Sequence, residues 1–232
     1  MRGLFMRILN LYAGLGGNRK LWENCEVTAV EYNEKIADAY SKMYPHDSVI
    51  VGDAQEYLLK HFRDFDFIWA SPPCQTNSKA RFWYSRNSTR CLPKLPDLTL
   101  YQYKIFLEKF YDGLWVIENV IPYYDFLIKP TATIGHNAFW ANFNITKIEA
   151  PKIDKLFKRN TLAEVEAIKK WLGIEMEGII YSNTHSPTQV LRNCVHPEVG
   201  LHIYKCAFSN GFEKTETGRA FKKYGQFAAN VN

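Results

Sequence analysis

Short apolar runs alternate with longer amphipathic segments over the first half of the chain. The runs are rich in aliphatic and aromatic residues and are bounded by turn-forming residues, which is typical of buried strands. The segments between them repeat their apolar positions at helical spacing. The expected strands are residues 7–12, 27–31, 48–51, 66–70 and 114–117. The expected helices are residues 18–24, 34–43, 54–62, 97–112 and 162–172.

This alternation predicts an α/β fold with a largely parallel sheet. Chemically useful residues follow the expected strands, and the carboxyl ends of parallel strands open on one edge, where α/β proteins bind ligands. The glycine-rich turn after the first strand allows a close backbone approach to a nucleotide-like ligand. An acid after the second strand commonly bonds ribose hydroxyls. The residues at this edge are Gly14, Gly16, Gly17, Glu31, Asp53, Cys74 and Glu118.

Cys74 stands in the sequence Ser71-Pro72-Pro73-Cys74-Gln75, directly after an apolar strand. Neither proline donates to a ladder and each fixes φ near −65°, so the thiol is expected on a stiff loop. A deprotonated cysteine there is a strong nucleophile. A small, buried, unreactive cysteine is the alternative that the loop alone leaves open.

Residues 76–96 are polar, basic and aromatic, and they are expected to lack regular structure. The chain as a whole has a net charge of +5 and a pI near 8.8, which permits a polyanionic partner. The segment is therefore interpreted either as a solvated loop or as a phosphate-contacting rim beside Cys74. Its cationic and aromatic residues are Lys79, Arg81, Phe82, Trp83, Tyr84, Arg86, Arg90 and Lys94.

Several broad classes of protein are disfavoured. No apolar run reaches the ~18 residues of a membrane helix, and the amino terminus turns polar too quickly for a signal peptide. The five cysteines are scattered without a C-x-x-C pair, so no metal site and no disulfide framework is expected. A reducing cytoplasm is the expected location.

Four motifs, taken in order, resemble the DNA (cytosine-5) methyltransferase family. They are Asn10-Leu-Tyr-Ala-Gly-Leu-Gly-Gly17, Glu31, Pro72-Pro-Cys-Gln75 and Glu118-Asn-Val120. The resemblance covers most of residues 7–145, and the segment 189–197 is similar to the late family segment that packs against the cofactor site. It implies a Rossmann-like S-adenosylmethionine-dependent methyltransferase fold, with a mostly parallel twisted sheet and helices on both faces. The implied divisions are a catalytic domain at 1–145, a small target-recognition-like segment at 146–186 and a carboxyl-terminal segment at 187–232.

The resemblance also implies the chemistry. Cys74 adds to carbon 6 of a cytosine that has been flipped out of duplex DNA, and Glu118 binds the base at N3. Carbon 5 then attacks the methyl group of S-adenosylmethionine. The implied cofactor residues are Asn10, Tyr12, Ala13, Gly14, Gly16, Gly17, Glu31, Asp53, Pro72 and Asn193. The implied substrate-binding residues are Ser71, Gln75, Arg81, Asn119 and His136.

Three departures from the family pattern stand out. Asn10 replaces the usual aspartate of the first motif, and the usual Arg-x-Arg element after the Glu-Asn-Val motif is absent. His136 is a candidate donor in its place, with an ordinary turn histidine as the alternative. The third departure is the short recognition segment, which suggests relaxed or partner-assisted recognition.

The leading interpretation is an active enzyme that works on DNA as a monomer, in a restriction-modification, orphan or phage setting. Methylation of RNA, such as tRNA, and a catalytically idle module that binds cofactor and nucleic acid are the alternatives. A general Rossmann-like enzyme with a structural cysteine would explain the glycine turn alone.

Overall fold

The structure is a computed structural model that describes residues 5–153, 161–176 and 186–209. Within these residues the strands form one sheet in the order β3-β2-β1-β4-β5-β7-β6. The first five strands of that order are parallel, and β7 runs antiparallel to both β5 and β6. The strands are β1 (Met6–Leu11), β2 (Cys25–Glu31), β3 (Ser48–Val51), β4 (Phe67–Ala70), β5 (Leu114–Val120), β6 (Ala132–Ile134) and β7 (Asn137–Ala141).

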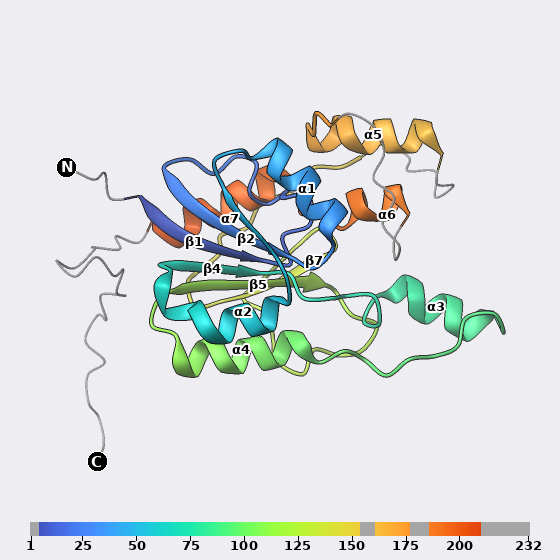
Figure 1. Cartoon of the computed structure of the whole chain (residues 1–232). Helices are drawn as coiled ribbons and strands as arrows, with labels where there is room; N and C mark the ends of the chain where they lie inside the picture. The colour runs from blue at the N-terminus through green and yellow to red at the C-terminus, as the bar shows by residue number, and fades with distance from the viewer. Residues whose placement is uncertain (1–4, 154–160, 177–185, 210–232) are drawn as a thin grey trace, which may run out of the picture.

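Helices cover both faces of this sheet (Figure 1). One face packs against α2 and α4 through residues such as Leu58 and Leu107, and the other packs against α7 through Ile203. The predicted Rossmann-like α/β fold is confirmed. The helices are α1 (Glu34–Met43), α2 (Ala54–His61), α3 (Lys79–Asn87), α4 (Thr99–Phe110), α5 (Leu162–Leu172), α6 (Pro187–Arg192) and α7 (Pro197–Phe208), and a 3-10 turn spans Phe62–Asp64.

The expected strand at 48–51 and the expected helices at 34–43 and 162–172 have the predicted bounds. Local capping explains the two helix starts. The Asn33 side chain accepts from the backbone N–H groups of Lys35 and Ile36, and Thr161 does the same for Glu164. Gly173 ends α5 in the left-handed conformation, at φ 60°.

Two expectations about local structure are wrong. Residues 18–24 form turns and a bend before β2, and two of these turns are closed by the Arg19 N–H donating to Gly16 O and the Trp22 N–H donating to Arg19 O. The segment 76–96 contains α3, whose first turn is capped by Ser78 accepting from the Arg81 N–H. The polar composition of residues 76–96 predicted a loop, although Ser78 and the residues after it can start a helix.

A third difference concerns the fifth strand, which extends past residue 117. Glu118, Asn119 and Val120 belong to β5, because β7 pairs with them along their whole length. The antiparallel partner is distant in the chain, so the apolar run alone could not show the extension.

The carboxyl-terminal third consists of α5, α6 and α7 in the described residues. Val165, Ile168 and Leu172 of α5 pack with Leu15 and Ile36, so α5 lies over the turn after β1 and over α1. Residues 154–160 and 177–185 of the expected recognition segment, and 210–232 of the expected last segment, lie outside the described residues. In the part of the chain that is described, no helix has the length and apolarity to span a bilayer.

Candidate active site

Cys74 lies on a loop that leaves the carboxyl end of β4, at the middle of the sheet. β4 ends at Ala70, and the Ser71 N–H donates to Leu11 O at 3.2 Å before the two prolines redirect the chain. The Asn77 N–H then donates to Cys74 O at 3.0 Å, which closes a turn around the thiol. The predicted stiff loop is therefore held from both of its ends.

Two asparagines fix the loop from neighbouring elements. Asn119 Nδ2, on β5, donates to Pro72 O at 3.0 Å in a buried hydrogen bond. Asn77 Nδ2 donates to Asp97 O at 2.9 Å, and the Asp97 N–H donates to Thr76 Oγ1 at 2.8 Å. These bonds tie the Cys74 loop to β5 and to the start of α4, so the position of the thiol is set by the sheet.

Glu118 stands beside this loop on β5 and is only 7% exposed. Asn137 Nδ2, on β7, donates to Glu118 Oε1, and the Ser71 hydroxyl also hydrogen-bonds to the carboxyl group. Burial raises the pKa of Glu118, and these two hydrogen bonds oppose the rise without cancelling it. The arrangement favours a carboxyl group that holds a proton more tightly than an exposed glutamate does.

The Cys74 thiol also has a strongly altered pKa. Burial is the largest cause, the negative charge of Glu118 adds to it, and together they raise the pKa of Cys74 to about 12. The electrostatic coupling shows that thiol and carboxyl are neighbours at the carboxyl ends of β4 and β5. In the protein alone, the thiol is therefore protonated at neutral pH, next to a carboxyl group whose pKa is raised by burial.

The glycine turn after β1 lies on the same edge of the sheet. Glu31 Oε2 accepts from the Gly14 N–H at 3.0 Å and Oε1 accepts from the Asn33 N–H at 2.9 Å, so the turn and the end of β2 are joined. Gly16 has φ 68°, and a Cβ at this position would lie 2.6 Å from the rings of Tyr40 and Tyr44. A side chain at Gly16 is therefore excluded twice, by the backbone and by α1.

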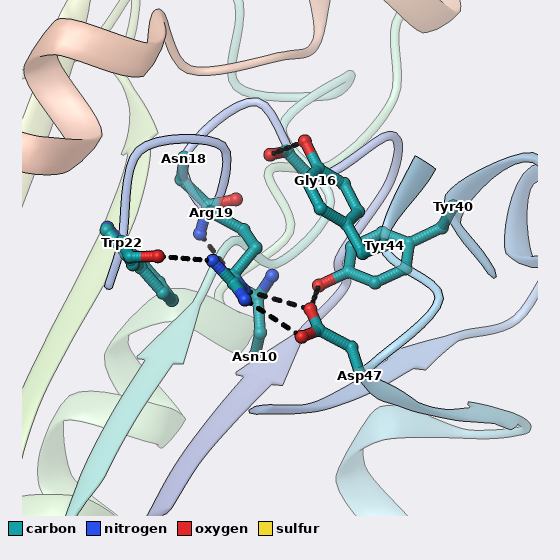
Figure 2. Close-up of polar contacts among 8 residues, drawn as sticks. All are labelled: Asn10, Gly16, Asn18, Arg19, Trp22, Tyr40, Tyr44 and Asp47. Atoms are coloured by element: carbon teal, nitrogen blue, oxygen red, sulfur yellow. Dashed lines mark hydrogen bonds and ion pairs between the residues drawn. The ribbon is translucent and has the colours of Figure 1, made fainter. Parts of the chain in front are cut away.

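A buried ion pair holds the residues that follow this turn (Figure 2). The Arg19 guanidinium donates to both carboxylate oxygens of Asp47 at 2.9 Å, and also to Trp22 O at 2.7 Å. The Tyr40 hydroxyl donates to Asp47 Oδ2 at 2.8 Å, and the Tyr44 hydroxyl donates to Gly16 O at 2.8 Å. The glycine turn is thereby tied to α1 and to the loop before β3.

S-adenosylmethionine needs open space beside the glycine turn and an acceptor for its ribose hydroxyls. A Cβ built on Gly14 would meet nothing within 4 Å, so there is open space beside the turn. Each Glu31 oxygen accepts one backbone bond and retains acceptor capacity for a ribose hydroxyl. The open space and the fixed carboxylate fit the cofactor, whose methionine part would lie at the turn and whose ribose at Glu31.

The other expected cofactor residues differ in setting. Tyr12 has φ 56°, a rare value for a residue with a side chain, and its hydroxyl lies 3.0 Å from that of Tyr103 on α4. Asp53 is exposed and caps α2 by accepting from the Glu56 N–H at 2.8 Å. Ala13 and Pro72 are buried at this edge.

Asn10 and Asn193 are placed less directly. Asn10 is 1% exposed, its Oδ1 accepts from Asn18, and the Tyr40 hydroxyl lies nearby. Through this bond Asn10, on β1, holds the segment that follows the glycine turn. Asn193 is exposed at the end of α6, and the next two residues, Cys194 and Val195, contact Gly17, where a Cβ would lie 2.5 Å from Val195 O.

The expected substrate residues are spread more widely. Ser71 and Asn119 lie at the Cys74–Glu118 pair, as described above. Gln75 begins the turn before α3, and its carbonyl accepts from Ser78 Oγ at 3.4 Å. Arg81 donates to Leu92 O at 3.2 Å within its own segment. His136 is exposed in the β6–β7 turn, where its carbonyl accepts from the Ile121 N–H.

Sequence reasoning missed two contributors to the site. Asn137 contacts Glu118, and Asp47 anchors Arg19, yet neither residue belongs to a motif. The sequence signal that could have indicated Asn137 is its place as a polar residue at the start of an apolar run, which forms β7 beside β5. For Asp47 no sequence signal distinguished it from a solvated loop acid.

Residues 6–120 match the family described as C-5 cytosine-specific DNA methylase. None of the curated proteins compared with the chain matches it.

Similar solved structures include three methyltransferases. A mutant of DNMT2 from Spodoptera frugiperda is 24% identical, over 50% of this chain and 35% of its own, with a TM-score of 0.35. The Entamoeba histolytica methyltransferase EhMeth is 13% identical, over 88% of this chain and 98% of its own, with a TM-score of 0.49. A putative DNA modification methyltransferase encoded within an E. coli prophage is 19% identical, over 52% of this chain and 33% of its own, with a TM-score of 0.33.

This chain therefore spans about a third of the DNMT2 and prophage proteins. The family match covers the glycine turn, Glu31, the Cys74 loop and Glu118 within one continuous stretch. Residues 6–120 are thus a C-5 cytosine-specific DNA methylase domain, and the methyl donor of this family is S-adenosylmethionine.

Proposed function

We propose that this protein methylates carbon 5 of cytosine in DNA through a covalent bond to Cys74. The observation that supports this most is the placement of Cys74 and Glu118 side by side at the ends of two central parallel strands. A nucleophile and a proton donor next to each other match the two demands of the reaction, an attack on carbon 6 and neutralisation of the ring at N3.

The chemical steps can be written for these residues. The Cys74 thiolate forms a bond to carbon 6, the electrons of the 5,6 double bond move into the ring, and Glu118 gives its proton to N3. S-adenosylmethionine, when bound, supplies an electrophilic methyl group to carbon 5. The donor leaves as a neutral thioether once its methyl–sulfur bond breaks. Loss of the carbon 5 proton to a base and departure of the Cys74 sulfur then restore the 5,6 double bond, and the N3 proton returns to Glu118.

The altered pKa values suit this sequence of events. A carboxyl group that keeps its proton can donate to N3, and burial of Glu118 favours that state. The Cys74 thiol, with its pKa raised to about 12, is protonated in the free protein and must lose its proton to solvent before it attacks. Glu118 adds to the raised thiol pKa only while it is ionised, so a Glu118 that holds its proton leaves the Cys74 thiolate less unfavourable.

A nucleic-acid substrate is supported by α3 and the segment around it. No acidic residue occurs between Asp66 and Asp97, while lysines and arginines recur there. None of the residues of α3 is buried, and Trp83 and Tyr84 are 61% and 56% exposed. Exposed aromatic rings among cations are suited to stacking on bases and to contacting phosphates. Phe82 stacks on Tyr123 and holds this surface next to the Cys74 loop.

Glu118 is buried and Cys74 is half-buried at the carboxyl edge of the sheet, so a cytosine within a duplex would have to be flipped out to reach them. We propose duplex DNA as the substrate, read by a single copy of the chain. A role for residues 146–186 in target recognition, and a restriction or phage setting, remain predictions.

The test uses the full chain with labelled S-adenosylmethionine and unmethylated DNA, followed by base-resolved mapping of 5-methylcytosine. A duplex that contains 5-fluorocytosine is run in parallel, because fluorine at carbon 5 prevents release of the cysteine adduct. Methyl transfer together with an adduct at Cys74 supports the proposal. The matched variant Cys74→Ser should give neither product while it still binds S-adenosylmethionine.

Normal turnover in Cys74→Ser would overturn the covalent mechanism. Transfer to tRNA but not to DNA would replace the proposed substrate with RNA. Cofactor binding without transfer to either nucleic acid would identify an idle binding module.

A further inference from the structure

The reacting carboxyl group of Glu118 is held from the neighbouring strand by Asn137. In the β5–β7 ladder Glu118 is paired with Phe139 and Val120 with Asn137, so Glu118 and Asn137 are diagonal neighbours on one face. Asn137 Nδ2 donates to Glu118 Oε1 across this diagonal. Gly135, at φ 60°, and His136 form the tight connection from β6 that sets the register of β7.

Among the described residues, no cation contributes to the shifted pKa of Glu118. Asn137 from β7 and Ser71 from the loop after β4 are neutral hydrogen-bond partners. The titratable group that interacts with it from the same loop is the Cys74 thiol. Trp69 Nε1 donates to Ser71 Oγ at 3.0 Å, which leaves the Ser71 proton to point at the carboxyl group.

Asn119, the next residue on β5, does not share this task. Its side chain is turned toward the Cys74 loop, where Nδ2 donates to Pro72 O, while Oδ1 accepts from the Val120 N–H at 3.1 Å. The two asparagines thus serve opposite partners, since Asn119 orients the nucleophile loop and Asn137 orients the carboxyl group.

We propose that Asn137 is a positioning residue that fixes the Glu118 carboxyl group and assigns its proton to Oε2. The carbonyl oxygen of a protonated carboxyl group accepts an amide N–H better than its hydroxyl oxygen does, so the bond from Asn137 to Oε1 favours the proton on Oε2. Asn137 thereby determines which oxygen presents the proton to N3 of the base. This inference rests on the proposed cytosine-5 chemistry.

The first measurement concerns the carboxyl group itself and needs no substrate. NMR of the full chain with ¹³C-labelled glutamate follows the Glu118 carboxyl signal, assigned by its loss in Glu118→Gln. Because the Asn137 bond lowers the pKa of Glu118, its removal in Asn137→Ala should move the titration midpoint to higher pH. The control Thr133→Ala, an exposed change on β6 of the same hairpin, should leave the midpoint unchanged.

The second measurement follows exchange of tritium from carbon 5 of cytosine in DNA, without S-adenosylmethionine. Adduct formation makes carbon 5 an enamine carbon that exchanges its hydrogen with water, so exchange reports the steps that use Cys74 and Glu118. Asn137→Ala should slow tritium exchange about tenfold. In a plot of exchange rate against pH, the fall on the alkaline side should move to higher pH. The near-isosteric Asn137→Asp should do the same, because two facing carboxyl groups cannot both ionise.

Equal midpoints and equal exchange rates in wild type, Asn137→Ala and Thr133→Ala would overturn the inference. An unchanged midpoint would do so even if exchange were slowed, because slower exchange alone could reflect a general structural loss. A wild-type protein that exchanges no tritium and forms no 5-fluorocytosine adduct would instead refute the proposed function, and the NMR midpoint would then still decide whether Asn137 controls Glu118.

Discussion

Asp47 and Glu118 are two carboxylates with buried side chains, and their surroundings differ. The Asp47 side chain is 2% exposed and meets the Arg19 guanidinium and the Tyr40 hydroxyl. Glu118 is 7% exposed and meets two neutral partners, Asn137 and Ser71. Asp47 is paired with a full positive charge, whereas Glu118 is not.

The difference fits a structural role for Asp47 and the reactive role proposed for Glu118. The Arg19–Asp47 pair is a rigid joint between the segment after the glycine turn and the loop before β3. An acid with neutral partners holds its proton, which is useful to a residue that must give the proton to a base. The sign of the neighbouring charge, more than the depth of burial, therefore distinguishes the two roles.

The largest expected effect comes from replacing the Glu118 carboxyl group with an amide, which is neutral and cannot donate a proton as an acid. Glu118→Gln should slow methyl transfer about 100- to 10,000-fold, the usual contribution of a positioned proton donor. DNA affinity should change far less, because the amide keeps the size of the side chain and one acceptor oxygen. Single-turnover transfer and DNA binding are measured on the same preparation. Equal losses in both would mean that Glu118 is structural.

Removal of the other carboxylate should affect stability first. Asp47→Ala is expected to lower the free energy of unfolding by about 3 kcal/mol, because it leaves Arg19 buried without a partner. Binding of S-adenosylmethionine, followed by calorimetry, should weaken as the glycine turn loosens. The control Asp38→Ala breaks an exposed pair with Lys42 and should cost less than about 0.5 kcal/mol. A loss as small as that of the control would contradict the structural role of Asp47.

The coupling between Glu118 and the thiol can be measured by alkylation of Cys74, followed by peptide mass spectrometry. With a thiol pKa of about 12, alkylation in the free protein should rise about tenfold per pH unit up to at least pH ~10. In Glu118→Gln it should be faster, by roughly severalfold, at those pH values where the wild-type carboxyl group is ionised. A plateau near pH ~8.5, as for a free thiol, would contradict the buried setting of Cys74.

The smallest expected effect is on the stability of Glu118→Gln. Since burial raises the pKa of Glu118, the folded state binds this proton more tightly than the unfolded chain, and wild-type stability falls as the pH rises above ~4.3. The variant should be more stable than wild type by roughly 1 kcal/mol at neutral pH and equal to it in acid. The thermal midpoint at the two pH values tests this.

A matched variant should show the opposite sign. Lys104 hydrogen-bonds to the exposed Glu108 and lowers its pKa, so Glu108→Gln should lose a small amount of stability at neutral pH and none in acid. If Glu118→Gln behaved in the same way as Glu108→Gln, the contrast between the two kinds of carboxylate would not hold.

The sequence by itself determined the α/β fold and the order of its main elements. Apolar runs bounded by turn residues located β1 to β5 to within a few residues, and apolar positions at helical spacing located α1 and α5, because both signals act over short distances along the chain. The motifs around the glycine turn, Cys74 and Glu118 indicated the family for the same reason, since each is a contiguous stretch that follows a strand.

Only the tertiary structure decided which side chains meet at the site. Asn137 reaches Glu118 because β7 pairs with β5, and Asp47 reaches Arg19 because α1 folds back on the glycine turn. The end of β5, the turns at 18–24 and the start of α3 were likewise set by partners or local hydrogen bonds that a hydrophobic pattern does not encode. Hydrogen bonds and ion pairs between distant segments depend on where the backbone brings two residues, so they become visible only when the chain is folded.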